Sequence, residues 1–227
     1  MNVAAPTILI ADDHPLFREA LKGAVARLLP QARLLEADSA EALYALAPLH
    51  PDADLLLLDL NMPGAQGYST LVHLRAAQPQ LPVIVVSARE EPSVMRRALD
   101  HGAAGFIPKS SDSQTIGIAI ATVLEGGTWA PESAGQATGV DTEEAQVAER
   151  LRELTPQQFR VLAMVSTGLL NKQIAYELDV SEATVKAHMT AVMRKLGVGN
   201  RTQAVLLAGK LALDPGGVVL PPDDSDG

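Results

Sequence analysis

The first half of the chain alternates short aliphatic runs with amphipathic stretches of helical period. Several of the runs are almost continuously apolar, as expected of parallel strands that are covered on both faces. Strands are predicted over Thr7–Ala11, Arg33–Ala37, Asp54–Asp59, Pro82–Ser87 and Ala104–Ile107, and helices over residues 15–29, 39–47, 67–78, 92–101 and 112–124. Regular alternation predicts right-handed crossovers and an α/β domain over residues 1–126, with a flavodoxin-like five-stranded parallel sheet of order 2-1-3-4-5.

The pattern changes after residue 126. Residues 127–150 are rich in glycine, alanine and acidic residues, which predicts a linker with helix in its later part. Residues 151–213 keep only the helical period, and we expect them to form a small all-α domain. Residues 214–227 are rich in Pro, Gly and Asp, a composition that predicts a disordered tail.

Capping residues divide the second domain into helices. Residues 155–158 (TPQQ) combine a threonine N-cap, a proline at the first helical position and a glutamine that completes a capping box. A short helix over Asn171–Leu178 is followed by a tight turn, and Ser181 then caps a longer helix, Glu182–Leu196. This arrangement predicts a helix-turn-helix, with a fourth helix over Asn200–Leu213.

The helix predicted over residues 182–196 has two different faces. An apolar stripe at helical spacing should pack inward, and it consists of Val185, Met189, Val192 and Leu196. The opposite face carries Ala183, Lys186, Ala187, Thr190 and Arg194. Small side chains with a few long cations suit close approach to a DNA major groove about 12 Å wide.

The charge of the chain is unevenly distributed. The net charge of −9 at first argues against a nucleic-acid partner. Residues 1–126, 127–150 and 214–227 carry −5, −4 and −4, whereas residues 151–213 have 8 Lys and Arg against 4 Asp and Glu, a balance of +4. Screening limits distant charges to a reach of about 8 Å at physiological salt. The local positive balance therefore leaves double-stranded DNA open as a partner of the second domain.

Two absences narrow the possible classes of protein. The chain has no cysteine, which excludes disulfide frameworks, zinc sites with thiolate ligands and cysteine nucleophiles. The first apolar run, Thr7–Ala11, is too short for a signal peptide or a membrane span. We therefore expect a cytoplasmic protein without a membrane partner.

Polar side chains follow the predicted strands of the first domain. Asp12 and Asp13 follow the first strand, Asp59 closes the third, Ser87 closes the fourth, and Lys109 lies just beyond the fifth. Functional residues of open α/β sheets gather at the carboxyl ends of the strands, so these five should converge.

Three clustered carboxylates repel each other unless a cation joins them. Mg²⁺ is the expected ion, because it prefers carboxylate, carbonyl and water ligands. The backbone carbonyl of Asn61 is a candidate for a further ligand.

The motifs that hold these residues resemble the receiver domain of two-component response regulators. They are ADDHP, LLDLNMPGAQG, VVSA and GFIPKS, which begin at residues 11, 57, 85 and 105. The resemblance implies that Asp59 accepts a phosphoryl group from a phosphohistidine of a sensor histidine kinase, while Asp12, Asp13 and Asp59 hold Mg²⁺. Ser87 and Lys109 would contact the phosphoryl oxygens, and Phe106 would be the rotating aromatic of the switch. The resemblance implies no enzyme beyond the domain's own phosphoryl transfer and dephosphorylation.

The sequence NKQIAYELDVSEATVKAHMTAVMRKLGV, residues 171–198, resembles the LuxR-type DNA-binding domain of NarL/FixJ regulators. The resemblance implies base-edge contacts by Lys186, Ala187 and Thr190 and phosphate contacts by Lys172, Thr184 and Lys195. It also implies a homodimer that binds two operator half-sites when active.

Three residues depart from the pattern of this domain. Asp179 stands where glycine is usual in the turn. Leu170 replaces a common serine cap, so we expect Asn171 to take over the capping role. Arg160 stands where glutamate is usual, a change that would alter the contact with the receiver domain.

Four alternatives stay open. A degenerate receiver would work without phosphate, although the acidic residues are all present. A ligand-sensing LuxR-type regulator would need an apolar cavity instead of an acidic site. An aspartyl-phosphate hydrolase would need an acid/base carboxylate where Asn61 stands, and an amide cannot serve. The helical domain could also be a protein-interaction module.

Overall fold

The structure is a computed structural model that describes residues 5–65 and 67–213. Contacts divide these residues into two compact units. The first unit contains residues 5–65 and 78–140, and the second contains residues 67–77 and 141–213. The tail predicted over residues 214–227 lies outside the described residues.

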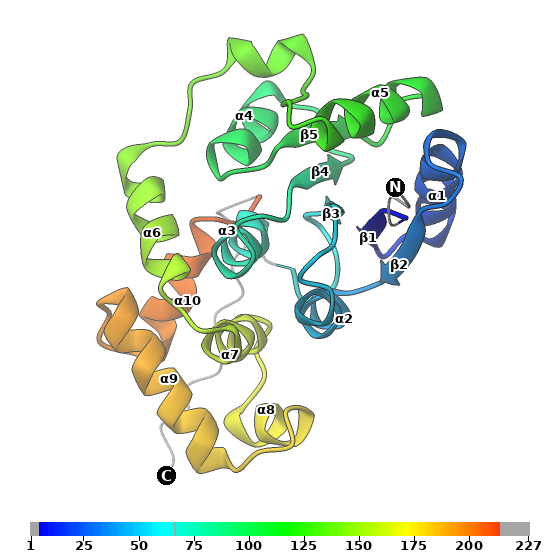
Figure 1. The fold of residues 1–227 in the computed structure, drawn as a ribbon. Coiled ribbons are helices and arrows are strands. Elements are labelled where there is room, and N and C mark those ends of the chain that lie inside the picture. Colours follow the sequence, from blue (N-terminus) through cyan, green and yellow to red (C-terminus); the bar gives the residue numbers. More distant parts are fainter. Residues whose placement is uncertain (1–4, 66, 214–227) are drawn as a thin grey trace. The chain divides into compact units, whose positions relative to one another are not determined.

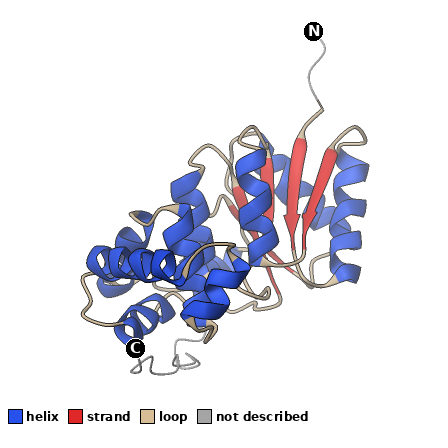
Figure 2. Ribbon diagram, turned by 90° about the horizontal axis from the view of Figure 1, so that it is seen from below, coloured by secondary structure: helices blue, strands red, loops and turns tan. Residues whose placement is uncertain are grey.

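A five-stranded parallel sheet forms the centre of the first unit (Figures 1 and 2). Its strands are β1 (Thr7–Ala11), β2 (Arg33–Ala37), β3 (Leu55–Asp59), β4 (Val83–Ser87) and β5 (Gly105–Pro108). The order β2-β1-β3-β4-β5 confirms the predicted topology. Every residue of β3 and β4 is buried, which explains why these strands are almost continuously aliphatic.

Helices cover both faces of the sheet. On one face, α1 (Pro15–Leu28) and α5 (Ser113–Leu124) lie side by side. They bury Leu21, Val25, Ile116 and Ile120 in one core with strand residues such as Ile10 and Leu57. The remaining helical segments of this unit are α2 (Ala40–Leu46), the 3-10 turn η1 (Ala47–Leu49), α4 (Pro92–Asp100) and the 3-10 turn η2 (Glu132–Gln136).

The register of the sheet aligns the carboxyl ends of its strands. Asp59 pairs with Val86, and Ser87 pairs with Pro108, so β3, β4 and β5 end at neighbouring positions. On the other side of β3, Ala11 pairs with Leu58. The residues that follow β1 and β5 therefore begin beside Asp59, which is the geometric basis of the candidate site.

Residues 127–140 fold back onto the first unit, a feature that the linker composition did not indicate. Trp129 pairs with the edge of β5: its N–H donates to Ala104 O at 3.2 Å, and the Phe106 N–H donates to Trp129 O at 2.9 Å. Farther along, Ala134 is buried where η2 packs on α4. The Val140 N–H donates to Asp100 Oδ2 at the end of α4, at 2.9 Å. We call residues 127–140 the strap.

The second unit is helical. It combines α3 (Tyr68–Ala77) with α6 (Thr142–Arg152), α7 (Pro156–Ser166), α8 (Asn171–Glu177), α9 (Glu182–Leu196) and α10 (Arg201–Gly209). Helix α9 has the predicted bounds, whereas α10 ends at Gly209 and does not reach Leu213. Among the described residues, no helix is long and apolar enough to cross a bilayer.

The strap gives a prediction about local opening. Replacing Asp100 with alanine removes the carboxylate that accepts from the Val140 N–H. A hydrogen bond to a charged group stabilises by about 1.5–3 kcal/mol, so hydrogen exchange at Val140 should become about tenfold faster or more. Hydrogen exchange with mass spectrometry over the strap measures the change. Arg96→Ala is the matched control, since Arg96 pairs with Asp100 Oδ1 and does not bond Val140. Equal exchange in wild type and Asp100→Ala would contradict this anchor.

Candidate functional sites

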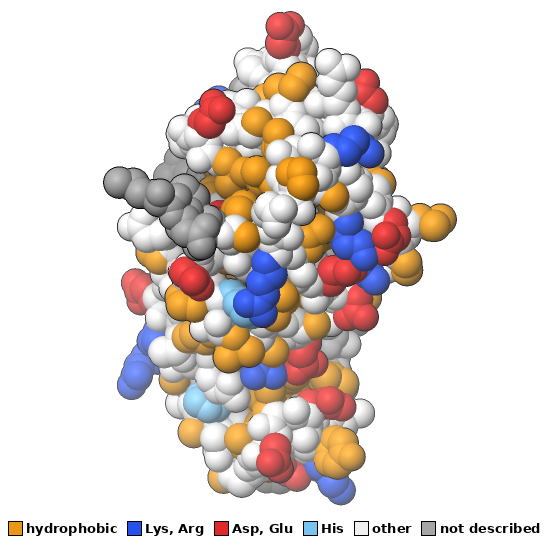
Figure 3. Space-filling view, turned by 45° about the vertical axis from the view of Figure 1, so that its right-hand side comes forward, with side chains coloured by type: hydrophobic (Ala, Val, Ile, Leu, Met, Phe, Trp, Pro, Cys, Tyr) orange, Lys and Arg blue, Asp and Glu red, His pale blue; other side chains and the backbone are white. Residues whose placement is uncertain are grey.

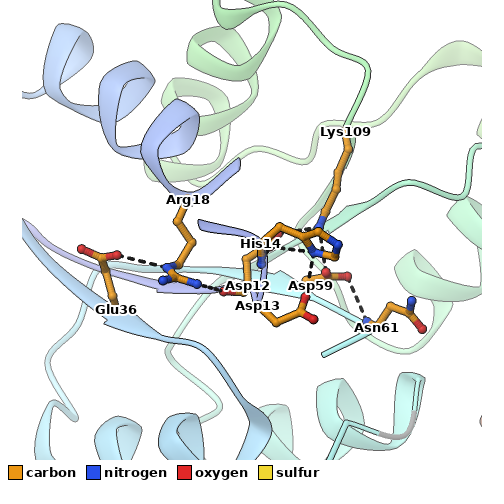
Figure 4. Close-up of polar contacts among 8 residues, drawn as sticks. All are labelled: Asp12, Asp13, His14, Arg18, Glu36, Asp59, Asn61 and Lys109. Atoms are coloured by element: carbon orange, nitrogen blue, oxygen red, sulfur yellow. Dashed lines mark hydrogen bonds and ion pairs between the residues drawn. The ribbon is translucent and has the colours of Figure 1, made fainter. Parts of the chain in front are cut away.

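Asp12 is completely buried directly after β1, and each of its polar groups has a partner (Figure 4). Its N–H donates to Ala37 O at 3.0 Å, and its Oδ1 accepts from the His14 N–H at 2.7 Å. Its Oδ2 lies 2.6 Å from Lys109 Nζ. Its main-chain oxygen accepts from Arg18 Nη1, also at 2.6 Å. The loop after β1 is therefore held in one conformation.

Asp59 ends the central strand β3 and is 2% exposed. Its Oδ1 accepts from the Asn61 N–H at 2.9 Å, and its Oδ2 accepts from Lys109 Nζ at 2.7 Å. Burial raises the pKa of the Asp59 carboxyl above its usual value, and the hydrogen bonds from Lys109 and Asn61 offset only part of this rise. Asp59 is thus a carboxylate held in a poorly solvated position.

Lys109 lies between the two buried carboxylates in Figure 4. Burial alone would lower the pKa of this ammonium, but its hydrogen bonds to Asp12 and Asp59 outweigh burial and raise the pKa. The Phe17 ring also lies 4.9 Å from Nζ, in a cation–π contact. The lysine therefore stays charged at neutral pH and balances part of the negative charge.

Ser87 and Phe106 occupy the neighbouring strands β4 and β5. Ser87 is buried, and its Oγ accepts from the Arg89 N–H at 3.1 Å. Phe106 is completely buried. An open pocket lies above these strand ends, lined by His14, Leu16, Phe17, Asp59, Asn61, Ser87, Ala88, Arg89 and Lys109. The structure thus brings Asp12, Asp59, Ser87 and Lys109 together at the strand ends. The fifth predicted polar residue, Asp13, lies next to them in the loop after β1.

The carboxylates suit a hard divalent cation. Ligand atoms of Asp12, Asp13, His14 and Asp59 lie within 4.8 Å of one another. Opposite ligands of an octahedral ion with bonds of 2.0–2.1 Å are about 4.2 Å apart, so small side-chain rotations would close this set on one ion. His14 Nδ1 lies 2.8 Å from Asp13 Oδ1, a contact that no sequence motif indicated.

In the second unit, side-chain caps position the helix-turn-helix. The Thr184 N–H donates to Ser181 Oγ at 3.1 Å at the start of α9. The predicted capping box of α7 is present, with Gln158 N–H donating to Thr155 Oγ1 and Thr155 N–H donating to Gln158 Oε1. Val185, Met189, Val192 and Leu196 are all buried, as predicted.

The predicted DNA-facing residues lie mostly on the surface of α8 and α9. Lys172, Lys186, Ala187 and Thr190 are exposed, and Thr184 is half-buried. Lys195 differs, because its Nζ donates to Glu153 O and to Gln158 Oε1, both at 2.8 Å. Lys195 therefore joins α9 to the end of α6 and the start of α7. Thr184 Oγ1 lies 2.9 Å from Ser181 Oγ, and Thr190 Oγ1 donates to Lys186 O, also at 2.9 Å.

The departures at Asp179 and Leu170 have different outcomes. Asp179 adopts φ 51°, the left-handed conformation that aspartate tolerates in place of glycine. The prediction that Asn171 caps α8 is wrong. Asn171 is the first helical residue, and its Oδ1 accepts from Arg201 Nη1 at 3.0 Å. The Leu170 N–H is satisfied instead by Gln173 Oε1, at 2.8 Å.

Basic side chains are not gathered on the face drawn in Figure 3. There, Lys and Arg side chains stand singly among Asp, Glu and apolar side chains.

Comparison with known families assigns both parts of the chain. The family "Response regulator receiver domain" matches residues 8–121, and "Bacterial regulatory proteins, luxR family" matches residues 152–208. The first match contains every candidate residue of the acidic pocket. The second contains every candidate DNA-facing residue.

Individual relatives match along nearly the whole chain. The glycerol metabolism activator of Pseudomonas putida is 43% identical over 212 residues, which cover 90% of this chain and 95% of the relative. The nitrate/nitrite response regulator NarL of Escherichia coli K12 is 31% identical, with the same coverage. Among solved structures, RcsB of Salmonella enterica serovar Typhimurium bound to promoter P1flhDC has a TM-score of 0.54 at 26% identity. That match covers 92% of this chain and 98% of RcsB.

The ion pairs of Lys109 give a prediction about the pKa of Asp59. In the Mg²⁺-free protein, Asp59 should titrate above the usual value of an aspartate, because burial disfavours its charged form. Lys109→Met should raise this pKa further, because the ammonium is lost while Asp12 remains close. Carbon-detected NMR of the Asp59 carboxyl against pH measures both values. Lys22→Met is the control, since Lys22 pairs with Glu19 and Glu36. An unchanged or lower Asp59 pKa in Lys109→Met would show that the Lys109 ammonium does not stabilise the charged form of Asp59.

Proposed function

Because the chain belongs to the response regulators that join a receiver domain to a LuxR-type DNA-binding domain, we propose that phosphorylation of Asp59 controls DNA binding by α9. One observation carries the proposal. Asp59 is a buried carboxylate at the end of β3, and its Oδ2 bonds the ammonium of Lys109 beside Asp12. This arrangement combines a nucleophile with a fixed positive charge.

The proposed reaction transfers a phosphoryl group to an Asp59 oxygen from a phosphohistidine of a sensor histidine kinase. A P–O bond forms as the P–N bond breaks, and the imidazole leaves. Mg²⁺ bound by Asp12, Asp13, Asp59 and the Asn61 carbonyl would supply positive charge for the transferring group. Lys109 would pair with one phosphoryl oxygen. Ser87 can donate to another, because its Oγ accepts from Arg89 and keeps its own hydrogen for donation.

Phosphorylation changes the charge around Lys109. The group adds a charge of about −1.5 to −2 and three acceptor oxygens, which compete with Asp12 for the ammonium. Ser87 ends β4 and Lys109 follows β5, so drawing the two side chains toward Asp59 would pull on both strand ends. We assign Phe106 as the switch aromatic on β5. Its N–H bond to Trp129 O connects that strand to the strap.

The same pocket would return the protein to its resting state. Water attacking the acyl phosphate in line would release phosphate, so the receiver catalyses only its own phosphorylation and dephosphorylation. No other reaction is proposed for the chain.

The second unit would bind double-stranded DNA through α9. RcsB, similar along nearly the whole chain, was solved bound to a promoter in the presence of the phosphomimetic BeF3⁻. We propose that Lys186, Ala187 and Thr190 contact base edges and that Lys172, Thr184 and Lys195 contact phosphates. Helix-turn-helix proteins commonly bind two half-sites as dimers, so the active form is proposed to be a homodimer. The proposed boundaries are residues 1–126 for the receiver, 127–150 for the linker and 151–213 for the DNA-binding domain.

Intact-mass measurement with acetyl phosphate and Mg²⁺ tests the acceptor. The wild type should gain one phosphoryl mass, and Asp59→Asn should gain none, because an amide is not a competent nucleophile here. Asp38→Asn, which changes an exposed carboxyl beyond β2, should behave like the wild type. A phosphoryl mass on Asp59→Asn would identify another acceptor. No mass on the wild type would favour a receiver that works without phosphate.

Binding to a selected genomic fragment and to unrelated DNA, measured across salt concentrations, tests the DNA assignment. Lys186→Ala should lower the preference for the selected fragment by about tenfold, since a base-edge contact contributes about 1–3 kcal/mol of discrimination. Lys172→Ala should weaken both complexes equally and reduce the salt slope by about one.

Lys210→Ala is the charge-matched control, because Lys210 pairs with Glu143 of α6. Wild-type binding by both Lys186→Ala and Lys172→Ala would refute α9 as the recognition helix.

A further inference from the structure

The loop that carries Asp12 and Asp13 is fixed from outside the pocket by Arg18, a residue of α1. Arg18 Nη1 donates to the main-chain oxygen of Asp12 at 2.6 Å. This oxygen belongs to the peptide group that joins Asp12 to Asp13. Because that peptide plane sets the directions of the residues on either side, the guanidinium controls how the two carboxylates point.

A second contact orients the guanidinium. Arg18 Nε donates to Glu36 Oε2 on β2 at 3.1 Å, and Lys22 Nζ lies 2.8 Å from Glu36 Oε1. The hydrogen bond from Lys22, more than that from Arg18, keeps the pKa of Glu36 below its usual value, so Glu36 is ionised at neutral pH. Figure 4 shows Arg18 reaching between Glu36 and Asp12. The rigid donor fork of arginine can hold both acceptors, which a single ammonium cannot do with the same geometry.

We propose that Arg18 is a positioning residue for the divalent cation, an inference that rests on the proposed function of the pocket. Mg²⁺ requires near-ideal octahedral geometry, so a tilt of the Asp12–Asp13 peptide weakens its coordination. The residues behind metal ligands commonly contribute tenfold to a hundredfold in metal affinity. Arg18 acts in this way without touching the ion.

The sign of the effect separates positioning from charge. Arg18 is cationic, so by charge alone its removal would favour Mg²⁺ binding. Positioning predicts the opposite, namely weaker binding when Arg18 is replaced. The double variant Arg18→Gln with Glu36→Gln removes one charge of each sign and keeps the net charge of the wild type. It therefore tests the geometry alone.

Isothermal titration of the full chain with MgCl2, without a phosphoryl donor, measures the affinity. Arg18→Gln should raise the Kd for Mg²⁺ about tenfold, and the double variant should raise it similarly. Lys22→Gln, which loses a contact to Glu36 and keeps the bond from Arg18 to Asp12, should stay near the wild-type Kd. Urea unfolding midpoints report whether each variant remains folded. If Arg18→Gln does not fold, Arg18→Lys replaces it. Its Kd for Mg²⁺ should be higher than that of the wild type, by less than tenfold.

Phosphorylation by acetyl phosphate adds a second readout. The Mg²⁺ concentration for half-maximal rate should rise about tenfold in Arg18→Gln, while the rate at saturating Mg²⁺ returns to about the wild-type value. A wild-type or lower Kd in Arg18→Gln, beside normal Mg²⁺ binding by the wild type, would overturn the role of Arg18 alone. A wild-type protein that takes up no Mg²⁺ would overturn the proposed function and this inference with it.

Discussion

The ion pairs of Lys109 with Asp12 and Asp59 are the interaction on which the first unit depends. They bring two buried carboxylates to within 2.6 and 2.7 Å of one ammonium, which leaves one uncompensated negative charge. A buried charge without a partner costs several kcal/mol, so removing this cation leaves the pocket strained. The remaining negative charge is what a divalent cation would neutralise. The stability of the pocket and the binding of a divalent cation therefore both depend on compensating the negative charge of Asp12 and Asp59.

The sheet makes this interaction possible. In a parallel sheet the carboxyl ends of neighbouring strands meet at one edge, and the register places Asp59 beside the residues that follow β1 and β5. The aliphatic strands anchor this edge, since β3 and β4 are buried throughout. The charged side chains therefore lie directly beyond a buried apolar sheet. A charged side chain one residue earlier on a strand would fall within this apolar core.

This edge was predictable from sequence because strand ends are marked by a change from aliphatic to polar residues. The cap at Ser181 and the inward stripe of α9 were also predictable, because each depends on residues that are close together in the chain. The bond from Arg18 to Asp12, the return of Trp129 to β5 and the use of Lys195 within its own unit were not indicated. The last two join residues more than twenty positions apart, and Arg18 acts on a backbone oxygen. Such contacts leave no periodic pattern or motif in the sequence from which they could be predicted.

These unpredicted contacts constrain how a signal can leave the pocket. A phosphoryl group on Asp59 would be faced by Lys109 and a divalent cation, so its charge is compensated where it arises. Screening further limits any residual field to about 8 Å at physiological salt. The signal must then be carried by changes in contact. The strap, residues 127–140, runs along β5 and α4 within the first unit, and its Trp129 O accepts from the Phe106 N–H while its Val140 N–H donates to the Asp100 carboxylate. A shift of β5 would therefore act directly on the segment that precedes α6 and the helix-turn-helix.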